Sequence, residues 1–189
     1  MKKNDSDNIH DILLRVQSGD FNAFRQLFEQ YKTRVYSVAF GILCNVQNAN
    51  DVTQQVFVKL YRSISGFDVN RNFFTYLYKI TVNTCFDFLR KQKNRADPLD
   101  ANRIELPANE NPGALYDEKE LRAIIGKLAS RLSPRQRTVF VLRHIEGLKM
   151  KEIEEILNCN TSTVRTNLYF SRQKMKMWLE KEYPEFLED

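Results

Sequence analysis

The chain has 189 residues, of which 42% are apolar and 28% are charged, and its formal net charge is +5. This length and apolar content suit one ordinary domain or two small ones and exclude a disordered chain. Six glycines, five prolines and no long turn-rich run argue against an all-β sandwich or barrel, so we expect helices. The positive charge favours a polyanionic partner, although a mildly basic soluble protein explains it equally well.

The N-terminal stretch and the cysteines indicate the compartment. The opening MKKNDSDNIH carries charges with no apolar segment behind it, and no run approaches membrane-spanning length. The three cysteines, Cys44, Cys85 and Cys159, form no C-x-x-C pair, and only two histidines are available to help them bind a metal. We therefore expect a cytoplasmic protein with reduced, mostly buried thiols, no metal or cofactor and no membrane insertion.

Apolar residues recur at helical spacing along the first part of the chain. The first helix should end at Gly19, where glycine can adopt a left-handed conformation. Asp20 should cap a long second helix that ends near Cys44, and Asn48 should cap a third. A fourth helix should occupy about residues 72–92.

The periodic pattern fails between residues 96 and 120, a segment that holds three prolines and a glycine. Seven acidic side chains against two basic ones give this segment a net charge of −5. By the same count, residues 71–95 carry +5, from six basic side chains and one acid, and residues 158–176 carry +4. The sequence therefore predicts two basic helical modules separated by an acidic tether.

The second module shows the pattern of a helix-turn-helix unit. Ser133, followed by Pro134 and Gln136, should form a capping box that begins a helix with Val139, Leu142 and Ile145 directed inward. A short apolar helix follows, then the polar turn at residues 158–160. Asn160 should cap the last helix, whose Val164, Leu168 and Met175 share one apolar face. Such a second helix can enter the major groove of DNA.

The opposite face of that last helix is basic. Arg165, Tyr169, Arg172 and Lys176 follow one another at spacings of four, three and four residues. Arginine can bind phosphate or guanine in a bidentate manner, and threonine or asparagine near the helix start can reach base edges. An ordinary solvated basic face has the same composition, but the preceding short helix and capped turn favour DNA binding.

Three stretches of the chain follow one another in a distinctive order: NANDVTQQVFVKLY, FFTYLYKITVNTCFDFLRKQ and LSPRQRTVFVLRHIEGLKMKEIEEILNCNTSTVRTNLYFSRQKMK. Together they resemble the extracytoplasmic-function (ECF) sigma factors of bacterial RNA polymerase. The resemblance implies an all-α fold with an N-terminal helical bundle at residues 8–95 and a C-terminal helix-turn-helix domain at 113–183. A flexible acidic linker at 96–112 would join them.

This resemblance implies a role in transcription initiation without catalysis by the chain itself. The expected partners are the RNA polymerase core, through its beta and beta-prime subunits, promoter DNA and an anti-sigma factor. The resemblance assigns core-polymerase binding to Asp51, Gln54, Gln55 and Phe57, although packing in the core explains Phe57 at least as well. It assigns the minus-ten DNA to Phe73, Tyr76, Tyr78, Asn83, Arg90, Lys91 and Lys93, and packing in the core is the alternative for the three aromatic residues. It assigns the minus-thirty-five DNA to Arg165, Thr166, Asn167, Ser171 and Arg172.

Several positions depart from the family pattern. Gln55 stands where the family usually has an acid, and Tyr76 replaces a common tryptophan. Asn167 and Phe170 stand where arginines are common. Lys149 replaces the usual capping serine of the short helix, which should destabilise that helix start by roughly 1 kcal/mol. The preferred promoter bases are therefore left unassigned.

Two features of the chain suggest regulation. The acidic linker would thread the polymerase cleft and imitate nucleic acid, or it would act as a solvated spacer, and we weigh these alternatives equally. The two modules must also separate to bind a promoter. A compact form with its basic faces covered is therefore a hypothesis for the inactive state.

Two other functions compete with this interpretation. A repressor or activator acting without polymerase explains the helix-turn-helix, but leaves the second basic, aromatic-rich helix unexplained. A recombinase or nuclease would need clustered metal carboxylates or a positioned nucleophile, and the acids of the first module are scattered.

Overall fold

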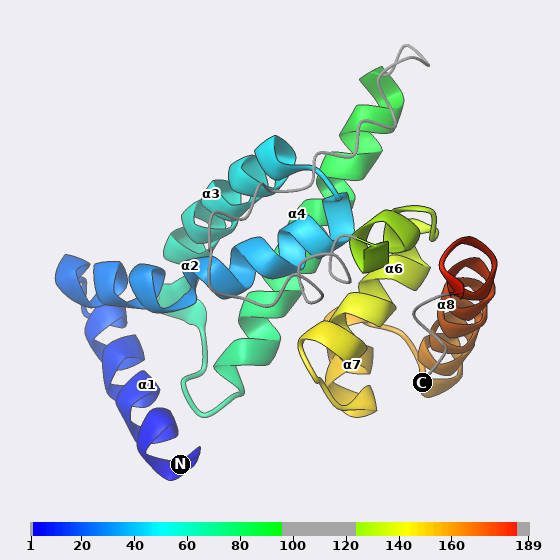
Figure 1. Cartoon of the computed structure of the whole chain (residues 1–189). Coiled ribbons are helices and arrows are strands. Elements are labelled where there is room, and N and C mark those ends of the chain that lie inside the picture. The colour runs from blue at the N-terminus through cyan, green and yellow to red at the C-terminus, as the bar shows by residue number, and fades with distance from the viewer. Residues whose placement is uncertain (1, 96–123, 185–189) are drawn as a thin grey trace, which may run out of the picture.

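A computed structural model describes residues 2–95 and 124–184 (Figure 1), and every regular element in these ranges is helical. The expected all-α class is therefore confirmed. The acidic linker predicted at 96–112 lies outside the described residues, as does the start of the second module.

The first module contains four long helices and one short 3-10 turn. They are α1 (Lys2–Gln17), α2 (Phe21–Leu43), α3 (Val46–Ser63), the turn Ile64–Gly66 and α4 (Phe73–Arg95). Helices α2, α3 and α4 pack against one another, and α1 leans against the N-terminal end of α2 (Figure 1). Their apolar faces form a core in which Leu27, Val35, Leu60 and Leu77 are almost fully buried.

Two of the three helix-terminal residues predicted in this module are confirmed, and one is wrong. Gly19 has a φ of +92°, and Asp20 accepts hydrogen bonds from the backbone N–H groups of α2, as predicted. Cys44 ends α2 with a φ of +53°. The third cap is Asn45 rather than Asn48, because the chain turns directly after α2 and Asn48 already donates its N–H to the Asn45 side chain, at 2.8 Å.

The second module is built from shorter helices around the last one. They are a helical stretch at 124–130, α6 (Pro134–Phe140), a π-helical turn (Val141–Ile145), α7 (Met150–Leu157) and α8 (Thr161–Glu182). The Ser133 side chain accepts a hydrogen bond from the Gln136 N–H, which is one half of the predicted capping box. The Gln136 side-chain oxygen instead accepts from Lys174 of α8, at 3.3 Å. A small separate core forms where the first and last helices of the module meet, with Ile124, Leu128, Leu132 and Met175 buried.

The π-helical turn corrects one prediction about the core. Val139 and Leu142 are buried as expected, but Ile145 is 54% exposed. A π-helical turn holds more residues than an α-helical one, so the side chains that follow rotate away from the face that a regular helix would present. Ile145 therefore faces solvent.

The two modules pack directly on each other. Val139, Leu142, Ile153 and Ile156 of the second module belong to the same buried cluster as the apolar residues of α2, α3 and α4. A Cβ atom built at Gly41 of α2 would lie 2.9 Å from a Val141 methyl group, so the backbones approach closely there. This arrangement positions α7 beside α4 (Figure 1).

The three cysteines agree with the expectation of mostly buried thiols. Cys44 and Cys85 are buried and Cys159 is half-buried, and all three are free. Burial raises the pKa of the Cys85 thiol to about 12. Within the part of the chain that the structure describes, no group of three or more potential metal ligands comes together, and no helix is long and apolar enough to cross a bilayer.

Candidate nucleic-acid interface

The turn between α7 and α8 fixes the direction of α8. Asn158 ends α7 in the left-handed conformation, with a φ of +48°. The Asn160 side-chain oxygen then accepts hydrogen bonds from the Thr163 N–H at 2.8 Å and from the Ser162 hydroxyl at 2.9 Å. The predicted cap is confirmed, and the positive end of the α8 dipole lies beside these hydroxyl groups.

Helix α8 separates an apolar face from a polar one, as the spacing predicts. Val164, Leu168 and Met175 are buried, whereas Arg165 and Arg172 are exposed. Thr166, Tyr169 and Lys176 are exposed as well. The exposed face carries cations, a hydroxyl and an aromatic ring, which is a composition suited to phosphates and base edges.

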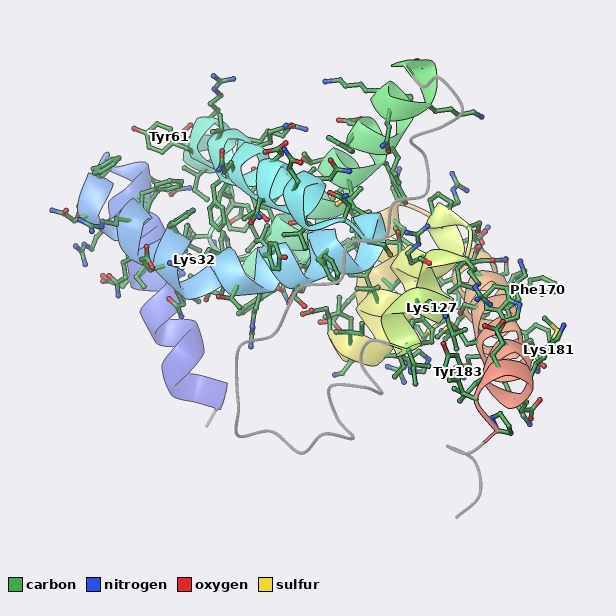
Figure 2. The ribbon with its side chains drawn as sticks, turned by 45° about the horizontal axis from the view of Figure 1, so that its top comes forward. Lys32, Tyr61, Lys127, Phe170, Lys181 and Tyr183 are labelled. Atoms are coloured by element: carbon green, nitrogen blue, oxygen red, sulfur yellow. The ribbon has the colours of Figure 1, made fainter. Side chains whose placement is uncertain are left out.

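Two of the residues assigned to the minus-thirty-five DNA are engaged within the helix. Ser171 is fully buried, and its hydroxyl donates to the Leu168 carbonyl at 2.8 Å, so a DNA contact does not fit its position. Asn167 is half-buried and donates to the Thr163 carbonyl at 2.8 Å. Phe170, which stands beside it, is 47% exposed and points away from α8 into solvent (Figure 2).

Arg172 has a partner that sequence patterns do not indicate. Its Nε–H donates a hydrogen bond to Nε2 of His144, at 3.0 Å. Burial, together with Arg172 and Arg143, lowers the pKa of His144 below its usual value. The neutral imidazole is therefore favoured, and it holds one edge of the Arg172 guanidinium at the surface.

Helix α4 presents a second face suited to nucleic acid. Tyr76, Asn83 and Arg90 follow one another at intervals of seven residues, which places them on one side of the helix. Lys79 and Phe86 lie next to this line, and sequence reasoning did not assign them. An aromatic ring, an amide and cations in a row can stack bases, bond their edges and hold the backbone.

The aromatic residues assigned to the minus-ten DNA have different environments. Tyr76 is half-buried, stacks on Phe67 with ring centroids 4.5 Å apart, and donates its hydroxyl to Ser63 at 2.6 Å. Phe73 is only 3% exposed and belongs to the core, so a base contact does not fit it.

Tyr78 is covered by the second module. It is 4% exposed, and its hydroxyl donates a hydrogen bond to the Glu146 carboxylate at 2.6 Å. Burial and this carboxylate raise the pKa of Tyr78 above its usual value. In this arrangement the Tyr78 side chain cannot contact DNA.

The C-terminal turns of α4 stand clear of the other helices (Figure 1). Arg90, Lys91 and Lys93 are exposed there. Arg90 pairs with Asp87 at 2.7 Å, and Asp87 also lies 3.4 Å from Lys59 of α3. Exposed ion pairs of this kind are weak, so these cations remain available to phosphates.

A third surface lies on α3. Asp51, Gln54 and Gln55 are exposed as expected, but Phe57 is only 4% exposed and packs against Phe28 of α2. The predicted polymerase contact of Phe57 does not fit this burial.

Two apolar residues extend the exposed face of α3. Val58 is 49% and Tyr61 is 56% exposed, and Tyr61 points outward (Figure 2). Their spacing of four and seven residues from Gln54 was a signal for this face that sequence reasoning missed.

Comparisons with known proteins bear on all three surfaces. The family model of sigma-70 region 2 matches residues 27–95, and that of sigma-70 region 4 matches residues 122–175. The chain is 34% identical to the ECF RNA polymerase sigma factor SigW of Bacillus subtilis (strain 168) over 178 residues, which cover 87% of this chain and 93% of SigW. It is 32% identical to the ECF RNA polymerase sigma-E factor of Escherichia coli (strain K12) over 171 residues, 86% of this chain and 89% of that protein.

The chain belongs to the ECF RNA polymerase sigma factors. The fold agrees with this assignment, because the structure of CnrH in complex with the cytosolic domain of CnrY superposes with a TM-score of 0.70 at 21% identity, covering 92% of this chain and 97% of CnrH. As a sigma factor, the protein is a transcription initiation factor that directs core RNA polymerase to specific promoters. The exposed faces of α3, α4 and α8 are its candidate sites for binding polymerase and promoter DNA.

Proposed function

We propose that this sigma factor uses three helical surfaces in initiation, each for a different contact. The exposed face of α3 binds the polymerase core, at its beta-prime subunit, through Asp51, Gln54 and Gln55, extended by Val58 and Tyr61. The row formed by Tyr76, Asn83 and Arg90 on α4 holds the minus-ten strand as the duplex opens. The exposed face of α8 reads the minus-thirty-five element.

The observation that carries this proposal is the alignment of Tyr76, Asn83 and Arg90 on α4. Extruding a base from a duplex costs a few kcal/mol, which stacking on an aromatic ring and hydrogen bonds to an amide can offset. A repressor needs only the duplex-reading face of α8. An initiation factor needs both faces, because it must also hold an opened strand.

The bond-forming chemistry belongs to the core polymerase in this proposal, and the sigma factor supplies position and strand separation. It acts in the cytoplasm, where polymerase and chromosome meet. An anti-sigma factor would control it by covering the surfaces that bind polymerase. The exposed apolar side chains Val58 and Tyr61 on α3 are a surface that such a partner can bury.

Run-off transcription from a genomic promoter library tests the proposal. Bacterial core polymerase is used with and without the protein. Transcripts that appear only with the protein, and share two sequence elements upstream of their starts, are the expected result. No transcripts, together with tight binding of the protein alone to duplex DNA, would support a repressor instead.

A further inference from the structure

The outward side of α8 carries an aromatic pair among polar side chains. The buried face of this helix is formed by Val164, Leu168 and Met175. Helical periodicity then identifies the side chains in the first part of α8 that point away from this face as Ser162, Thr166, Tyr169, Phe170 and Gln173. All five are exposed, so the hypothesis that a compact form covers both basic faces does not hold for α8.

Phe170 is a large apolar ring that the fold leaves in solvent. Its side chain is 47% exposed and points away from α8 (Figure 2). It contacts Tyr169, which is 59% exposed, with ring centroids 5.5 Å apart and ring planes at 70°. Edge contacts of this kind are favourable, so the two rings support each other's position. A single exposed apolar residue needs no explanation, but a supported pair on the outward side of a DNA-reading helix forms a binding surface.

The surroundings of the two rings are cationic. Arg165 and Arg172 lie on one flank of the outward side, and Lys174 lies on the other. Residues 158–176 contain no acidic side chain. This charge attracts a polyanion and disfavours a basic protein surface. The rings therefore continue the face of α8 that is proposed to bind the minus-thirty-five duplex.

The chemistry of a benzene ring limits what Phe170 can recognise. The ring has no hydrogen-bonding group, so it cannot bond a phosphate or the polar edge of a base. The apolar group that base pairs present in the major groove is the C5 methyl of thymine, and phenylalanine is one of the side chains that contact it. We propose that Phe170, supported by Tyr169, is a specificity-determining residue that contacts a thymine methyl group of the minus-thirty-five element. This inference rests on the proposed function of α8.

The contact gives a preference for one base pair at one promoter position. With thymine there, the methyl group and the ring remove apolar surface of each other from water. With cytosine in its place, the ring would cover an amino donor without accepting its hydrogen bond, which is costly. Arginine in place of Phe170 would have the opposite preference, because its guanidinium bonds O6 and N7 of guanine.

Uracil substitution tests the proposal, because deoxyuridine differs from thymidine by the C5 methyl group alone. Holoenzyme assembled from core polymerase and the full-length sigma factor is titrated, by fluorescence anisotropy, against a labelled promoter duplex selected by run-off transcription. Each thymine on both strands of its minus-thirty-five element is replaced in turn by deoxyuridine. Wild type is compared with Phe170→Ala. The control is Met177→Ala, because Met177 is 53% exposed on the same side of α8 but lies about two helical turns beyond Phe170.

We expect one uracil to weaken binding by wild type about fourfold, the scale of one methyl group returned to water, and to leave binding by Phe170→Ala unchanged. Met177→Ala should show the same loss as wild type. Phe170→Arg should bind a duplex with G·C at that position more tightly than one with A·T.

A uracil effect that is equal in wild type and Phe170→Ala, or no uracil effect in wild type, would overturn the proposal. A selected minus-thirty-five element without thymine would overturn it too. If Phe170→Ala weakens every duplex alike, the ring binds a protein partner rather than a base, and the proposal fails as well. A wild-type protein that starts no transcripts would contradict the proposed function and this inference with it, whereas transcription without the uracil effect contradicts this inference alone.

Discussion

Lys149 shows what a single cap residue contributes. Its backbone N–H donates to the Glu152 carboxylate at 2.7 Å, but its side chain makes no hydrogen bond to the start of α7. A serine there would accept a hydrogen bond from a backbone N–H that lacks a partner within the helix. We expect Lys149→Ser to raise the free energy of unfolding by about 1 kcal/mol, measured by urea denaturation. Lys151→Ser, at an exposed position inside α7, is the control and should give no gain.

His144 should make stability depend on pH. The fold lowers its pKa, through burial first and then through Arg172 and Arg143, so the unfolded chain binds the proton more readily than the folded one. The stability that this group contributes is present above the unfolded pKa, near 6.5, and is lost as the pH falls below it. Thermal unfolding at pH 8 and pH 5.5 should show a smaller difference for His144→Gln than for wild type. An unchanged difference would contradict this assignment.

Helix α8 is the element whose surface is easiest to test alone. Arg165 is exposed in its first turns, close to the Asn160 cap. Removing a phosphate or guanine contact typically costs about 1–3 kcal/mol, and a lost phosphate contact lowers the salt slope by about one. We expect Arg165→Ala to weaken holoenzyme binding to a minus-thirty-five duplex about tenfold. Lys181→Ala, at the far end of α8, should bind as wild type does.

Helix α3 should bind polymerase through a face that combines polar and apolar side chains. Gln54 is exposed on this face, and Tyr61, although 56% exposed, makes an edge contact with the Phe24 ring of α2, with ring centroids 4.9 Å apart. The double variant Gln54→Ala/Tyr61→Ala should lower the affinity for core polymerase at least about fivefold, because interface aromatics contribute strongly to binding. Its melting temperature should fall only slightly, through the lost contact with Phe24. Glu29→Ala on α2 is the control. If the double variant binds core polymerase with full affinity, the polymerase-binding site is not on this face of α3.

Most elements and one of the candidate surfaces could be predicted from local sequence. Asp20 and Asn160 cap helices as their residue types suggest, and the four-three-four spacing on α8 correctly gives its exposed face. The apolar spacing of α3 already favoured the burial of Phe57, whereas the burial of Ser171 could not be predicted, because it depends on what packs over that residue. The exposure of Ile145 depends on a π-helical turn for which no sequence signal was evident.

The whole molecule adds what no single element shows. The contact of Tyr78 with Glu146 joins residues 68 positions apart. A sequence pattern gives the face of a helix but not its partner in another module, so this contact was beyond prediction. Its consequence is that the Tyr78 side chain of the first module is covered by the second module.

Promoter opening tests the account most directly, because it requires α3, α4 and α8 together. Permanganate reactivity of thymines measures opening on a promoter selected by run-off transcription. We predict reactive thymines at the minus-ten element only when core polymerase and the sigma factor are both present, and a strong loss of reactivity with Asn83→Ala. Opening by core polymerase alone, or no opening with both present, would contradict the account.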